Sequence, residues 1–193
     1  MRKLAILIGG SGLVVSCQTP PPPPPPPEAA PMVDPNNPLF APGFMAKAAS
    51  GDQFEIQSSQ LALQMSSNPG VRNFANMLIA DHARMSQALA AAATAGKLTP
   101  PAPALLPAQQ STLDQLRTTG PNFDAAFRGA QIVAHQQALQ LMQNYAANGD
   151  VAVLRNTAQQ AIPMIQTHLG QAQMLSVAPP PPPPTVRQPG ERG

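Results

Sequence analysis

Residues 68–96 read NPGVRNFANMLIADHARMSQALAAAATAG, a stretch dominated by strong helix formers. It opens with Asn68 and Pro69, a capping residue followed by the residue type favoured at the first helical position, and it ends at Gly96. Apolar side chains recur along it at helical spacing, at Val71, Phe74, Leu78, Met85 and Leu89. The stretch therefore predicts one long amphipathic helix with a buried face.

Three further long helices are predicted from the same kinds of start and stop signals. One follows Pro42 and Gly43 and runs to about Ser66. Another covers residues 121–149, and the last follows Asp150, which is expected to cap it. With these helices the sequence predicts an all-α domain.

The links between these helices define the expected topology. The short links after the first and third long helices force antiparallel neighbours. The link between the second and third is rich in proline and carries a short helix around residues 111–118. The sequence thus predicts an up-down four-helix bundle over residues 43–176, with a short extra helix in one long crossing.

Both ends of the chain are predicted to be disordered. Pro20–Pro27 and Pro179–Pro184 are unbroken runs of a residue that lacks a backbone N–H and favours extended polyproline II. Residues 17–42 are expected to form a semi-rigid tether, and residues 177–193 a proline-rich tail.

The first 16 residues are expected to be a lipoprotein signal peptide. A basic start precedes an apolar stretch, residues 4–15, that is too short to span a bilayer permanently. Residues 14–17, Val-Val-Ser-Cys, resemble a bacterial lipobox, so lipidation is predicted at Cys17, and the membrane would be a partner through this lipid. An ordinary secretory signal that leaves Cys17 as a free thiol is the alternative.

The residue after the cysteine bears on the expected location. Gln18 stands there rather than aspartate, which resembles the pattern of lipoproteins sent to the outer membrane of Gram-negative bacteria. The predicted location is therefore the cell envelope, with the lipid in the outer membrane and the bundle facing the periplasm.

The composition argues against several classes of function. The formal net charge is +2 and only 10% of the residues are charged, so nucleic acid is not expected as a partner. The sequence contains no Gly-x-Ser-x-Gly, His-Glu-x-x-His or phosphate-loop motif. Catalytic residues are therefore not assigned, and the sequence argues against an enzyme more than for one.

Four polar side chains interrupt the apolar stripes, one in each long helix: Glu55, His82, His135 and His168. The first three lie near the midpoints of their helices and the fourth about one turn beyond its own. Because midpoints coincide in height in an antiparallel bundle, we expect these side chains to meet in one layer of the core. Burial of a charge without a partner is expensive, which favours mutual contact.

Two interpretations of this layer stay open. The first, which the sequence favours, is a hydrogen-bonded polar layer that fixes helix register. The second is a transition-metal site with Glu55, His82, His135 and His168 as ligands. No Glu-x-x-His pair, typical of di-iron bundles, is present. Asp81 points about 100° away from His82 on a helix, so we expect it to accept a histidine N–H rather than bind the ion.

These residues together resemble a known family. The segments that carry the resemblance are Phe54-Glu55-Ile56 to Leu61-Ala62, Asn68 to Val71, Phe74-Ala75 with Asp81-His82, Phe123-Asp124, His135 with Ala138-Leu139, and Pro163 followed by His168-Leu169. They are similar to the bacterial family called domain of unknown function 4142, over about residues 42–176. The resemblance implies a ferritin-like helical bundle in an exported, outer-membrane-associated protein, and it implies no established activity.

Two functions follow as hypotheses. The first is a membrane-anchored envelope lipoprotein whose bundle is a binding or structural module for an envelope protein or peptidoglycan. The alternative is a periplasmic protein that binds a transition metal or carries out metal-dependent redox chemistry, with the metal as its cofactor.

Overall fold

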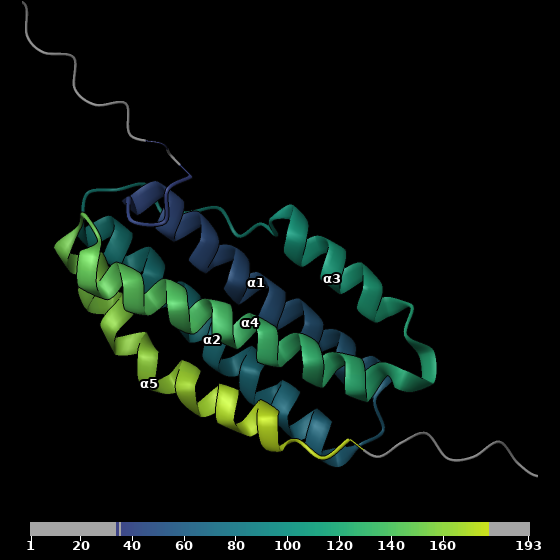
Figure 1. Ribbon diagram of the computed structural model, residues 1–193. Coiled ribbons are helices and arrows are strands. Elements are labelled where there is room, and N and C mark those ends of the chain that lie inside the picture. The colour runs from purple at the N-terminus through teal and green to yellow at the C-terminus, as the bar shows by residue number, and fades with distance from the viewer. Residues whose placement is uncertain (1–33, 35, 178–193) are drawn as a thin grey trace, which may run out of the picture. The chain divides into compact units, whose positions relative to one another are not determined.

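The computed structural model describes residue 34 and residues 36–177. Within this part, the chain forms α1 (Ala41–Met65), α2 (Pro69–Ala95), α3 (Pro107–Arg117), a 3₁₀ turn (Gly120–Asn122), α4 (Phe123–Asn148) and α5 (Ala152–Met174) (Figure 1). The all-α bundle with a short extra helix in the crossing is confirmed. The signal peptide, Cys17, the polyproline runs and most of both tails lie outside the described residues. No described helix combines the length and apolarity that a membrane crossing requires.

The four long helices pack around one core. α1 packs against α2 and α4, and α5 packs against the same two helices from the opposite side (Figure 1). Each of these neighbouring pairs is antiparallel, and the short links predicted this for α1 with α2 and for α4 with α5. α2 and α4 run in the same direction, because the crossing returns along the length of the bundle. α3 lies in this crossing and packs along α1 and α4.

The first helix begins earlier than predicted. Pro42 and Gly43 lie inside the first turn of α1 rather than before it, since proline at the start of a helix needs no N–H partner. The residues before α1 fold back over this turn, with the N–H of Phe40 donated to the carbonyl of Asn37 at 3.1 Å. A Cβ at position 43 would lie 2.3 Å from that carbonyl oxygen. Only glycine therefore allows this close approach.

The caps confirm one expectation and correct another. Asn68 caps α2 by accepting the N–H of Gly70 at 2.8 Å. Asp150 was expected to cap the last helix, but Val151 occupies the N-cap of α5. The carboxylate of Asp150 instead accepts the hydroxyl of Tyr145 at 2.8 Å. This hydrogen bond back to the end of α4 replaces the expected cap.

The core consists of two apolar clusters separated by a polar layer. One cluster lies at the end where α1 and α5 begin, around Phe44, Tyr145 and Leu154. The other lies at the opposite end, around Phe74 and Phe127, and includes the α3 leucines. Between the two clusters lies a layer of buried polar side chains from the middle parts of the helices: Asp52, Glu55, His82, Gln131, His135 and His168. The predicted polar layer thus exists at mid-height.

Candidate metal centre

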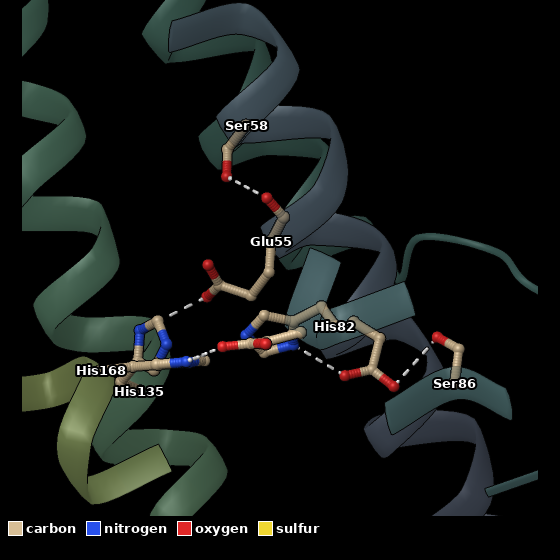
Figure 2. A network of polar contacts seen from close by, with 8 residues as sticks. Glu55, Ser58, His82, Ser86, His135 and His168 are labelled. Carbon is tan, nitrogen blue, oxygen red and sulfur yellow. Dashed lines mark hydrogen bonds and ion pairs between the residues drawn. The ribbon is translucent and has the colours of Figure 1, made fainter. Parts of the chain in front are cut away.

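Three histidines from three helices meet in this layer. His82 comes from α2, His135 from α4 and His168 from α5, and their exposed fractions are 3%, 0% and 1%. One ring nitrogen from each lies within 4.8 Å of the other two. Their ring centroids are 5.3 to 5.7 Å apart (Figure 2). We call His82, His135 and His168 the histidine triad.

The outer nitrogen of each imidazole is held by an oxygen. Nδ1 of His82 lies 2.8 Å from Oδ1 of Asp52, and Nε2 of His168 lies 2.9 Å from Oδ2 of Asp81. Nδ1 of His135 lies 2.8 Å from the main-chain carbonyl of Gln131, one turn earlier in α4. An oxygen without a proton can only accept, so each outer nitrogen donates its N–H. These contacts fix the tautomer of each neutral ring.

The inner nitrogens have no hydrogen-bond partner among the residues that the structure describes. Nε2 of His82, Nε2 of His135 and Nδ1 of His168 are fully buried and unpaired. With the outer nitrogen donating, the inner nitrogen of a neutral imidazole carries its lone pair. When all three rings are neutral, the triad therefore gathers three buried lone pairs at one place, and each buried acceptor without a partner costs about 1–3 kcal/mol.

The carboxyl group of Glu55 lies beside the triad rather than within it. Its Oε1 is 3.7 Å from Nδ1 of His135 (Figure 2), and its Oε2 has no hydrogen-bond partner within the described part of the chain. Burial raises the pKa of Glu55 from 4.5 to about 7, against the charge of His82, which lowers it. Glu55 can thus gain or lose a proton near neutral pH while it faces the imidazoles.

The three imidazoles differ in their affinity for protons. Burial lowers the pKa of His135 to about 3, so this ring stays neutral. Burial also lowers the pKa of His168, and the hydrogen bond to Asp81 offsets this only in part. Burial acts in the same direction on His82, but the hydrogen bond to Asp52 and the charge of Glu55 outweigh it, so that pKa is raised. Two of the three rings are therefore kept as neutral bases, the form that binds metals.

The arrangement fits the requirements of a metal site with three histidine ligands. Imidazole nitrogens bind such an ion at about 2.0–2.1 Å, which places two of them about 3.3 Å apart. The triad nitrogens lie within 4.8 Å of one another, so small side-chain rotations bring them to this distance. Oxygens that hold the second nitrogen of each ring are a regular feature of histidine metal sites. Three imidazoles also leave a fourth position open.

Most of the residues singled out from the sequence come together here. The triad and Glu55 share one layer, although only the histidines supply the converging nitrogens. Asp81 accepts the N–H of His168, and its carboxylate also contacts the Arg84 guanidinium. These two contacts hold the pKa of Asp81 below its ordinary value although its partial burial acts to raise it.

Sequence reasoning missed two residues of the layer. Asp52 holds His82 and also accepts the Ser86 hydroxyl at 3.1 Å (Figure 2). Gln131 supplies the carbonyl for His135, and its side chain donates to the Ser58 hydroxyl at 2.9 Å. The spacing in the sequence could have identified both residues. Asp52 is three residues before Glu55 and Gln131 is four before His135, which places each pair on one helix face.

Comparison with solved structures finds a similar fold. The chain is similar to the structure described as CopM in the Cu(II)-bound form, with a TM-score of 0.58 and 21% sequence identity. The similarity covers 70% of this chain and 94% of that one. At this level of identity, the likeness establishes the helical bundle alone.

Comparison of the sequence identifies the family. No curated protein matches the chain. The profile of the family described as Domain of unknown function (DUF4142) matches residues 23–175, which includes all five helices and the histidine triad. The chain therefore belongs to the DUF4142 family.

Proposed function

We propose that this protein binds one transition-metal ion through Nε2 of His82, Nε2 of His135 and Nδ1 of His168. The observation that carries the proposal is the convergence of three buried, unpaired ring nitrogens whose opposite nitrogens are each held by an oxygen. A polar layer that served only to fix helix register would pair these acceptors with donors. A metal cation satisfies all three at once.

Copper(II) is the metal that we propose first. Imidazole nitrogen suits copper, zinc, iron and nickel, and among divalent ions affinity for such sites is highest for Cu(II). The similar fold of a protein described as Cu(II)-bound supports the same choice. Glu55 adds a carboxyl group next to the site that can balance the charge of the ion. Of the two hypotheses from the sequence, the metal-binding one thus has the better support.

The cellular location is the second part of the proposal. Residues 14–17 and the basic, apolar start support lipidation at Cys17 after export, which would hold the bundle in the cell envelope on its proline-rich tether. Labelled fatty acid should then be incorporated into the wild-type chain and not into Cys17→Ser. A wild-type chain that takes up no labelled fatty acid would rule out the anchor. A partner in the envelope, protein or peptidoglycan, stays a prediction.

Metal binding is tested on the full chain purified without chelator. Titration with Cu(II), Zn(II) and Ni(II), followed by calorimetry and by melting temperature, should give one bound ion per chain and a higher melting temperature. His135→Ala should weaken Cu(II) binding at least 100-fold, because it removes one of three ligands. A matched control is Asp114→Asn, an exposed acid paired only with Gln110 and Arg117, which should leave Cu(II) affinity unchanged.

Two results would contradict the proposal. One is a wild-type chain that binds no ion and shows no change in melting temperature with any of the three metals. The other is Cu(II) binding that His135→Ala leaves intact while circular dichroism shows the variant to be folded. The first result would mean that the triad nitrogens are satisfied by water, and the second that copper binds elsewhere.

A further inference from the structure

A groove between α1, α3 and α4 leads from the surface to the histidine triad. Its volume is about 920 Å³, and its lining includes Glu55, His82 and His135 but not His168. A smaller groove of about 210 Å³, bordered by α2 and α5, contains none of the three histidines. The groove thus approaches the triad between α1 and α4. α1 carries no histidine, so this side of the triad has no fourth imidazole.

Small residues keep this groove open. Gly51 of α1 and Gly129 of α4 border it, and a Cβ at either position would meet no atom within 4 Å. Four alanines of α4 line the same space, one for each turn: Ala126, Ala130, Ala134 and Ala138. α3 and the link before it cover the groove with Leu106, Pro107 and Leu116. The helix in the crossing therefore spans the space between α1 and α4 without filling it.

Polar atoms that lack partners among the described residues lie directly behind the inner end of the groove. Nε2 of His82, Nε2 of His135 and Oε2 of Glu55 are unpaired, and the exposed fractions of these residues are 3%, 0% and 3%. Most of the remaining lining is apolar, and Lys47 contributes the one basic side chain among the lining residues. A molecule in the groove would meet an apolar wall along its length, and it would reach the coordinating centre once the side chains at the inner end move, because the ring nitrogens there are fully buried.

On the basis of the proposed metal centre, we propose that the groove binds a small organic molecule with an apolar body and one lone-pair donor atom. The donor would take the coordination position that three imidazoles leave open, which is the arrangement of sites that act on a ligand rather than of purely structural sites. The volume of the groove lies in the range of small-molecule pockets, which are mostly apolar with a few polar groups. The carboxyl group of Glu55 lines the same end of the groove, 3.7 Å from the His135 ring.

The test uses the Cu(II)-loaded full chain and two azole probes, imidazole and 4-phenylimidazole. Both should change the visible and electron paramagnetic resonance spectra of the bound copper in a saturable way. The phenyl group should make the second probe bind at least ten-fold more tightly, because the apolar wall removes it from water. Copper retained after gel filtration should equal that of the untreated sample.

Variants at two glycines test whether the groove is the route. Gly51→Leu adds a side chain inside the groove and should weaken 4-phenylimidazole binding at least ten-fold with Cu(II) affinity unchanged; Gly129→Leu should act in the same direction. Gly170→Leu is the matched control, since Gly170 also lies within a helix with open space at its Cβ but does not line the groove. It should bind both probes as the wild type does.

The outcomes separate this inference from the metal proposal. A chain that cannot be loaded with copper removes both. A loaded chain whose spectra neither probe changes, or from which the probes strip the copper, removes the groove inference alone. Equal affinity for the two probes, or wild-type binding by both Gly51→Leu and Gly129→Leu, also overturns it.

Discussion

Asp52 is the residue that fixes the orientation of His82. Its carboxylate lies 2.8 Å from Nδ1 of the ring and is itself held by the Ser86 hydroxyl. Partners that hold metal-binding histidines in this way typically change metal affinity by about 10–100-fold when they are mutated. The role of Asp52 is therefore one of positioning, because it acts on the site through His82.

Substitution of Asp52 should give a graded loss of Cu(II) affinity. Asp52→Asn keeps an acceptor for the Nδ1 proton and should cost about ten-fold, whereas Asp52→Ala leaves that N–H unpaired and should cost up to about 100-fold. Calorimetric titration measures both, with circular dichroism as the test of folding. Equal and unchanged affinities in two folded variants would show that Asp52 has no part in the site.

Glu55 predicts a pH dependence of stability in the metal-free protein. Its pKa is raised from 4.5 to about 7, so between these values the folded state holds more protons than the unfolded state. The stabilising contribution is complete below pH 4.5 and is lost as the pH rises through about 7. Glu55→Gln removes this loss. The free energy of unfolding of the variant should therefore rise by up to about 3 kcal/mol relative to that of the wild type as the pH rises from 4.5 to 8.

Urea unfolding of chelator-treated protein at several pH values measures this difference. The wild type serves as the reference at each pH. Burial lowers the pKa of His135 to about 3, which makes stability increase with pH, and this effect is common to both chains and cancels in the difference. A difference that stays constant from pH 4.5 to 8 would contradict the burial of an ionisable carboxyl group at this position.

At the scale of helices, the sequence was informative because each helix carries its own stop and start signals. Asn68 with Pro69 and the glycines at 96 and 149 gave boundaries within a few residues of the observed helices. The errors arose where a contact with the adjoining link replaced the expected signal at the end of a helix. Asp150 bonds the Tyr145 hydroxyl instead of capping α5, and the fold of the chain over Gly43 allows α1 to begin at Ala41.

Substitution of alanine for two glycines of α1 should change the stability of the protein in opposite directions. Gly43→Ala places a Cβ against the Asn37 carbonyl and should destabilise the protein by about 1–3 kcal/mol. Gly51→Ala meets open space in the middle of a helix and should stabilise it by up to about 1 kcal/mol. Chemical denaturation measures both. Stabilisation by Gly43→Ala would show that the segment before α1 does not fold back over its first turn.

At the scale of the molecule, helix length and link length together predicted that polar side chains would meet at mid-height. The midpoint argument placed Glu55, His82 and His135 in one layer, and the structure confirms this placement. The groove could not be predicted, because it depends on α3 lying along α1 and α4, and the sequence of a short helix in a long crossing does not determine where it packs.

The central claim is that three imidazoles of one bundle hold a single metal ion. A crystal structure of the Cu(II)-loaded chain, with anomalous diffraction measured at the copper edge, tests it most directly. The account predicts one anomalous peak in the core, bonded to Nε2 of His82, Nε2 of His135 and Nδ1 of His168. A copper peak only at the surface or at a chain end, with the imidazoles hydrogen-bonded to water, would contradict it.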